Sequence, residues 1–253
     1  MRFASLGSGS RGNATLVQSG STCVMVDCGL SVTETVSRLA RLDSTPADIN
    51  AILITHEHTD HVNGVVRFAS RFGIPVHCTQ GTLAGCGKIG LKEAELFDPH
   101  ADFSLGDLMI IPLTVPHDAR EPTQFVFTDG SYKLGVLTDT GTITSHIQRL
   151  LDGCDGLVLE CNHDREMLEN GPYPVQLKSR VGGSLGHLSN DQAAGLLASL
   201  DCTRFQHLVA AHLSEKNNTP DLVRTVLAAA MGCDSDWIQV ATQDQGLGWR
   251  EFT

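Results

Sequence analysis

Apolar and polar residues alternate, or apolar residues form short unbroken runs, in many segments of the chain. Runs of about 4–8 residues bounded by Gly, Pro, Asn or Asp are typical of β-strands. The apolar run at residues 51–54 is typical of a strand buried on both faces. The pattern predicts strands over residues 3–6, 14–18, 22–26, 51–54, 109–115, 124–128, 132–137, 156–159, 208–211 and 238–240.

Other segments carry apolar residues at intervals of three and four, as on one face of an α-helix. Residues 31–42 follow this pattern, and Ser31 stands at the N-cap position. The spacing predicts helices over residues 31–42, 62–72, 145–151, 190–200 and 220–231. The first half is rich in strands, and helices and strands alternate in the second half. This order predicts two packed sheets covered by helices.

The length of 253 residues fits one domain over residues 1–253, or two merged halves, with an ample core. No segment approaches the ~18 apolar residues of a membrane span, and the first residues have no secretory signal. We therefore expect a cytoplasmic protein without a membrane partner. The formal charge of −11 disfavours nucleic-acid binding overall, although bound cations and placed arginines can reverse the field locally.

The chain has eight cysteines and no Cys-x-x-Cys pair, which argues against a zinc ribbon. For a cytoplasmic protein we expect these thiols to be reduced and mostly buried as small apolar side chains.

The densest group of metal-binding side chains is Thr55-His56-Glu57-His58-Thr59-Asp60-His61, directly after the strand predicted at 51–54. Two imidazoles two residues apart can converge on one cation from an extended turn. Asp60 and His61 can then face a second cation nearby. Imidazole together with carboxylate suits zinc, manganese or iron, so a metal site is favoured over a solvated polar loop.

The sequence His-x-His-x-Asp-His after a strand resembles the hallmark of the metallo-β-lactamase superfamily. The resemblance implies an α/β (α+β) fold, the αββα sandwich of two packed mixed sheets flanked by helices. It also implies two divalent cations, Zn²⁺ or Mn²⁺ with Fe as a further candidate. Their implied ligands are His56, His58, Asp60, His61, His117, Asp139 and His212. Asp27 looks like the early acidic residue that orients the histidine loop without binding metal.

Asp139 helps to choose among the branches of this superfamily. An aspartate there can bridge both cations and hold a hydroxide between them, whereas one group of metallo-β-lactamases has cysteine at this point. The intervals from His117 to Asp139 and from Asp139 to His212 are too short for the arm of tRNase Z enzymes or for a β-CASP domain. The resemblance therefore favours compact, nuclease-like hydrolases.

Glu160 and His187 resemble the glutamate and histidine that protonate the leaving oxygen in tRNase Z enzymes. A phosphodiester needs such an acid because an alkoxide is a poor leaving group. Asp60, Asp139, His187 and Glu160 are thus the candidate catalytic residues. The alternative for His187 is a place in a helix cap beside Ser189.

Segments 7–13, 160–164, 186–190 and 212–218 together resemble the YycJ (WalJ) branch, which implies a 5′-to-3′ exonuclease acting on DNA rather than RNA. The Gly/Ser segment 7–13 either presents backbone N–H groups to a phosphate or is a plain hairpin turn. Candidate substrate contacts are Ser10, Asn13, Asn162 and His163, and candidate phosphate contacts are Arg11, Arg120, Arg165, Lys178 and Arg180.

A second class of function stays open, because the same nucleophile can attack the carbonyl of a β-lactam, lactone or thioester. A missing export signal and Asp139 argue against a dedicated β-lactamase. A non-catalytic binding protein is disfavoured by the complete ligand set.

Overall fold

The computed structural model describes residues 1–253 except for the side chain of Lys88. Its strands are β1 (Arg2–Gly7), β2 (Ala14–Ser19), β3 (Thr22–Val26), β4 (Ala51–Leu53), β5 (Val76–Cys78), β6 (Glu95–Leu96), β7 (Phe103–Leu105), β8 (Leu108–Thr114), β9 (Thr123–Thr128), β10 (Lys133–Leu137), β11 (Gly156–Glu160), β12 (His207–Ala211), β13 (Gln239–Val240) and β14 (Leu247–Glu251). Its α-helices are α1 (Val32–Ala40), α2 (Thr59–Val62), α3 (Val65–Phe72), α4 (Gln80–Gly85), α5 (Ser145–Leu151), α6 (Arg165–Asn170), α7 (Val175–Val181), α8 (Asn190–Leu197) and α9 (Pro220–Met231).

The strands form two seven-stranded sheets of mixed direction, with the orders β14-β1-β2-β3-β4-β5-β6 and β13-β12-β11-β10-β9-β8-β7. Strands β3 to β6 run parallel in the first sheet, and β10 to β13 do so in the second. Parallel neighbours present their carboxyl ends at the same edge, where ligands bind in open α/β sheets. The register sets Val26 beside Leu53 and Glu160 beside Ala211, so the loops that follow these residues meet.

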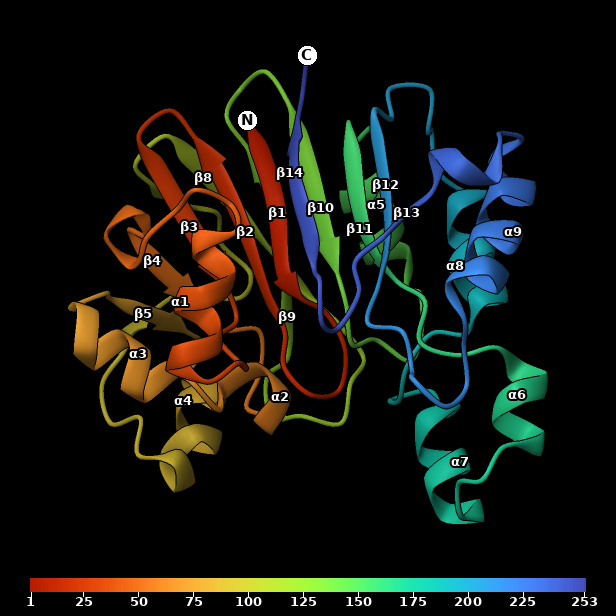
Figure 1. The fold of residues 1–253 in the computed structure, drawn as a ribbon, viewed down its shortest axis with the longest axis horizontal. Coiled ribbons are helices and arrows are strands. Elements are labelled where there is room, and N and C mark those ends of the chain that lie inside the picture. Colours follow the sequence, from red (N-terminus) through yellow and green to blue (C-terminus); the bar gives the residue numbers. More distant parts are fainter.

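Side chains alternate across each strand, and this divides the apolar residues into three layers. Val24 and Val26 lie between the sheets with Phe125 and Phe127. Met25, on the other face of β3, belongs to a cluster that joins the first sheet to α1 and α3. A third cluster joins the second sheet to α5, α8 and α9. Figure 1 shows the resulting order of helices, two sheets and helices, so the predicted αββα sandwich is confirmed.

The strands and helices predicted from the sequence are present with small shifts of their ends, and Ser31 caps α1 in a capping box with Glu34. The prediction of one helix over 62–72 is wrong at its start, because α2 ends at Val62 and α3 begins at Val65. The N–H of Gly64 donates to the Cys28 carbonyl instead of a carbonyl one turn back. The hydrogen bond between Gly64 and the segment around Cys28 thus interrupts the helix at this point.

The sequence patterns did not predict β5, β6, β7, β14, α4, α6 or α7. Figure 1 shows α6 and α7 extending beyond the same end of the sandwich at which α2 lies. Cys202 and Cys233 are half-buried and the other cysteines are buried, as expected. Among the described helices, none has the length and apolar character needed to cross a membrane.

Candidate metal centre

Three of the predicted site residues have left-handed backbone conformations. They are Asp27 (φ 61°), Asp139 (φ 49°) and His212 (φ 54°), at the ends of β3, β10 and β12. A positive φ is uncommon for residues other than glycine, and such strain gathers at functional sites. The strain turns these side chains towards the shared edge of the two sheets.

His56, His58 and His117 form the first group of ligand atoms. Their ring nitrogens lie within 4.8 Å of one another, and His58 Nδ1 is 3.3 Å from His117 Nε2. His117 Nδ1 donates to the carbonyl of Gly186 at 3.0 Å, so its Nε2 keeps a free lone pair. His56 Nε2 is buried without a hydrogen-bond partner among the described residues. Unpaired, converging imidazole nitrogens fit a bound cation.

Asp60, His61 and His212 form the second group. Oδ2 of Asp60 lies 3.3 Å from His61 Nε2 and 3.5 Å from His212 Nε2. Asp139 lies between the two groups, because it also shares a cluster with His56 and His61. Its Oδ2 is buried and makes no hydrogen bond with the described residues, although His61 Nε2 is 3.1 Å away. A bridging carboxylate would occupy this position.

The electrostatics of the second group require positive charge. Burial raises the pKa of Asp139, but the nearby His212 and His61 outweigh it and hold this pKa well below its usual value. Burial likewise lowers the pKa of His61, yet the neighbouring Asp139 and Asp27 raise it well above its usual value. Without a cation, buried protons must balance the buried carboxylates. Divalent cations would supply the same charge.

Asp27 fixes the histidine loop from behind. Its carboxylate accepts hydrogen bonds from Thr55 N at 2.9 Å and from His61 Nδ1 at 2.7 Å. With Nδ1 held by Asp27, a cation could replace the second proton of the His61 ring at Nε2, which is how outer carboxylates orient metal-binding histidines. The sequence did not single out Thr55, which joins the motif to Asp27.

Glu160 and His187 form a hydrogen-bonded pair beside these groups. His187 Nδ1 is 2.7 Å from Glu160 Oε1, while Thr140 N and Leu188 N donate to Glu160 Oε2. Burial lowers the pKa of His187, but the charge of Glu160 outweighs it and raises this pKa. Ser189, not His187, caps α8 in a capping box.

Comparison with known proteins agrees with this geometry. A family profile described as "Beta-lactamase superfamily domain" matches residues 22–212. Exodeoxyribonuclease WalJ of Streptococcus pneumoniae is 32% identical, over 98% of this chain and 91% of its own length. Exodeoxyribonuclease YycJ of Bacillus anthracis is 33% identical, over 88% of this chain and 86% of its own length.

The chain belongs to the WalJ/YycJ branch of the metallo-β-lactamase superfamily. Its fold is also that of the metallo-β-lactamase fold protein YhfI from Bacillus subtilis, with a TM-score of 0.77, 18% identity and 99% of both chains covered. A diphosphatase of the PhnP family has a TM-score of 0.71 at 20% identity, with 100% of this chain and 98% of the other covered. These two similarities concern the fold alone.

The metallo-β-lactamase centre opens into a cleft of about 360 Å³ lined by Ser10, His58, Asp60, Asp139, Asn162, His187 and His212, among others. Of the four candidate substrate contacts, Ser10 and Asn162 therefore face the cleft. Asn13 instead donates from Nδ2 to Asp60 Oδ2 at 3.1 Å. His163 is only 2% exposed, so a macromolecule cannot reach its ring without rearrangement.

The Gly/Ser segment 7–13 supports the candidate metal ligands. Backbone N–H groups of Ser8, Gly9, Arg11, Gly12 and Asn13 all donate to other protein atoms. The hydroxyl of Ser8 accepts from the N–H of His212 at 2.8 Å. These backbone N–H groups are therefore engaged within the protein, which favours the hairpin-turn alternative for the link from β1 to β2 over phosphate binding.

Most of the candidate phosphate contacts already have acidic or carbonyl partners. Arg11 pairs with Glu215 at 2.7 Å, and Arg180 pairs with Asp118 at 2.6 Å. Lys178 Nζ donates to the carbonyl of Glu169 at 2.7 Å, and Arg165 lies 3.6 Å from Asp191. These four basic side chains are therefore already engaged by partners within the protein.

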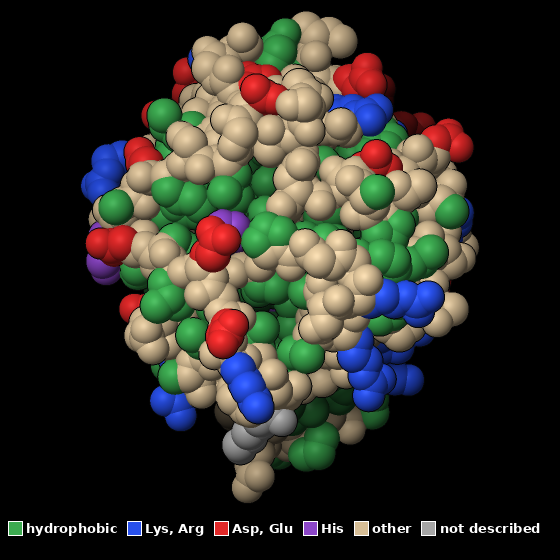
Figure 2. Space-filling view, turned by 90° about the vertical axis from the view of Figure 1, so that its left-hand side faces the viewer, with side chains coloured by type: hydrophobic (Ala, Val, Ile, Leu, Met, Phe, Trp, Pro, Cys, Tyr) green, Lys and Arg blue, Asp and Glu red, His purple; other side chains and the backbone are tan. Residues whose placement is uncertain are grey.

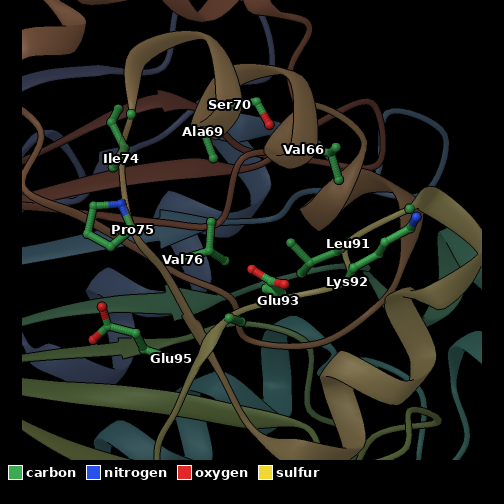
Figure 3. Close-up of a pocket in the computed structure, with 13 residues that line it drawn as sticks. Val66, Ala69, Ser70, Ile74, Pro75, Val76, Leu91, Lys92, Glu93 and Glu95 are labelled. Carbon is green, nitrogen blue, oxygen red and sulfur yellow. The ribbon is translucent and has the colours of Figure 1, made fainter.

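A second, larger hollow of about 730 Å³ lies away from this centre, between α3 and residues 90–95. Figure 3 shows Val66, Val76 and Leu91 in it, together with Lys92 and Glu93. Figure 2 views this side of the molecule, where apolar side chains gather among scattered charged ones. Among the described residues, the groups able to hold a metal all lie at the other site. The chemistry therefore selects the smaller cleft.

Proposed function

We propose that this chain is a metal-dependent phosphodiesterase that degrades DNA as an exonuclease, with the 5′-to-3′ polarity that its resemblance to the branch implies. One observation carries the proposal: the Glu160–His187 pair lies beside the metal-ligand groups. The names of the two bacterial relatives point to the same substrate.

Seven side chains would hold two cations, Zn²⁺ or Mn²⁺ or alternatively Fe. His56, His58 and His117 would hold the first, Asp60, His61 and His212 the second, and Asp139 would bridge them. Two such cations would activate water for in-line attack and neutralise charge on the phosphoryl oxygens. Asn13 and Asp27 would keep Asp60 and His61 in place.

His187 would act as the general acid. Glu160 accepts the hydrogen bond from its Nδ1 and stabilises the protonated ring, so Nε2 can donate a proton to the leaving alkoxide. Glu160 is itself held by two backbone N–H groups, and its pKa is about 2 because His187 outweighs the effect of burial. The glutamate therefore stays ionised while the histidine loses and regains its proton.

The acid separates this proposal from hydrolysis of a thioester, but not from opening of a β-lactam or lactone, because the amine and alkoxide that leave there also take up a proton. A thiolate leaves without protonation, whereas the alkoxide of a DNA strand does not. Specific activities on a DNA duplex and on a chromogenic β-lactam would compare the two classes directly. A higher turnover of the β-lactam would make the carbonyl hydrolase the better assignment.

The testing experiment is a time course on a 5′-phosphorylated, internally labelled DNA duplex. The protein would be loaded separately with Mn²⁺ and Zn²⁺, and Asp60→Ala would serve as the control. We expect the wild type alone to release short products from the 5′ end. Intact DNA under both metals, with the ions shown to be bound, would refute the nuclease assignment.

A further inference from the structure

The cleft at the metal centre has one wall that the proposed chemistry does not use. Tyr173, Leu177 and Val181 line it, from the segment that leads into α7 and from α7 itself. Ser10 and Ser214 lie elsewhere on the lining. The cleft is therefore bounded by metal ligands and by an apolar surface carried on a short helix.

The wall has the chemistry of a base-stacking surface. Tyr173 and Leu177 are both half-buried, so each keeps part of its apolar face open to the cleft. Bases stack on such aromatic and apolar surfaces with little dependence on sequence, because every base has a π-face. The cleft volume of about 360 Å³ lies at the lower end for small-ligand pockets, which suits one nucleotide rather than a duplex.

The wall is tied to the reacting groups at the C-terminal end of α7, by contacts of Arg180 and Val181. Arg180 Nε donates to Asp118 Oδ2 at 2.6 Å, and Asp118 Oδ1 lies 3.7 Å from His58 Nε2. The N–H of His187 donates to the carbonyl of Val181 at 2.8 Å. One end of the contact network thus reaches a metal ligand and the other reaches the general acid.

We propose that Tyr173 and Leu177 form a nucleoside subsite, which holds the nucleotide next to the phosphodiester that is cleaved. This inference rests on the proposed function and adds the substrate class that the cleft accepts: a single nucleotide unit at a strand end. Arg180 is a positioning residue here, because its guanidinium pairs with Asp118 and anchors the wall.

Two small phosphodiesters test the subsite. Thymidine 5′-(p-nitrophenyl phosphate) carries a nucleoside, whereas methyl p-nitrophenyl phosphate does not. Tyr173→Ala should raise KM for the nucleoside ester about 10-fold, the expected loss of one stacked base. Its kcat/KM for the methyl ester should stay within about twofold of the wild type, since stacking affects only the base.

Three variants control the interpretation. Tyr173→Phe keeps the ring and should behave as the wild type, whereas Leu177→Ala should repeat the selective effect more weakly. Val175→Ala changes the same helix at a position that is 78% exposed, and it should affect neither ester. Equal losses on both esters, or no loss on either, would overturn the subsite.

Binding of thymidine 5′-monophosphate to the metal-loaded protein, measured by calorimetry, separates the two proposals. If the wild type cleaves neither ester nor DNA, the phosphodiesterase function fails. Binding of the nucleotide that Tyr173→Ala weakens about 10-fold would still support the subsite. Equal binding by both proteins would overturn it whatever the activity.

Discussion

Replacing His187 by alanine tests the general acid and little else. The imidazole side chain is 19% exposed at the cleft, so its removal opens no closed core cavity. It makes its 2.7 Å hydrogen bond to Glu160, which retains two backbone N–H donors in the variant. We therefore expect the variant to fold with a melting temperature close to that of the wild type.

The size of the effect follows from the leaving group. Burial lowers the pKa of His187, but Glu160 outweighs it and raises this pKa, which favours the protonated ring that a general acid requires. General acid catalysis contributes about 10²–10⁴-fold when the leaving group is poor. His187→Ala should therefore slow the release of nucleotides from DNA by about that factor. A p-nitrophenolate leaves without a proton, so the thymidine ester should lose less than about 10-fold.

The assay compares kcat on DNA with kcat on the thymidine ester for the same preparations. Ser189→Ala is the matched control, because it removes the α8 cap and should cost about 1 kcal/mol of stability while leaving the ratio of the two kcat values unchanged. Equal losses of His187→Ala on both substrates, or full activity on DNA, would refute the acid role. A fall in stability without a change in this ratio would give His187 a structural role only.

Three further predictions concern metal affinity, acid stability and salt. Asn13→Ala removes the donor to Asp60 Oδ2, so metal titration should show about 10-fold weaker binding of one cation and unchanged binding of the other. If both affinities were unchanged, Asn13 would not support the metal site. Burial raises the pKa of Asp129, but the N–H groups of Tyr132 and Ser131 outweigh it and lower this pKa from 3.8 to about 2. Asp129 therefore stabilises the fold above its unfolded pKa and loses this effect as pH falls towards 2. At pH 7, urea unfolding should give Asp129→Ala a free energy of unfolding about 1 kcal/mol or less below that of the wild type. In strong acid the two free energies should be equal. Because Arg11 and other basic side chains near the site are paired with acids, the slope of log affinity for DNA against log salt should be shallower than about −3. A steeper slope would mean that these pairs open on binding.

The candidate metal ligands could be located from the sequence because their chemistry is local. His56 to His61 stand in one short segment after a buried strand, and His212 directly follows another. The contacts that support them join distant parts of the chain, as Asn13 does with Asp60 and Ser8 with His212. Ordinary polar residues such as these carry no sequence signal of a partner.

The helices and strands that the sequence did not predict are those with the weakest pattern of apolar and polar residues. Strand β6 has two exposed residues, so no alternation can mark it, and Gly248 interrupts the alternation of β14. Helix α6 has one buried residue and α7 has none, so neither shows a clear apolar face, whereas α5, as long as α7, has two buried residues four positions apart. The wall of the cleft was missed with them, because Tyr173 and Leu177 are common side chains whose position alone gives them a role.

The most direct test of the account measures bound metal and DNA degradation in the same samples. Elemental analysis would count cations per chain in the wild type, His117→Ala and Asp60→Ala, and each sample would then receive the 5′-phosphorylated duplex. The account predicts two cations and nucleotide release for the wild type, and one cation with little or no release for each variant. Full activity with a single bound cation, or intact DNA with two bound cations, would contradict it.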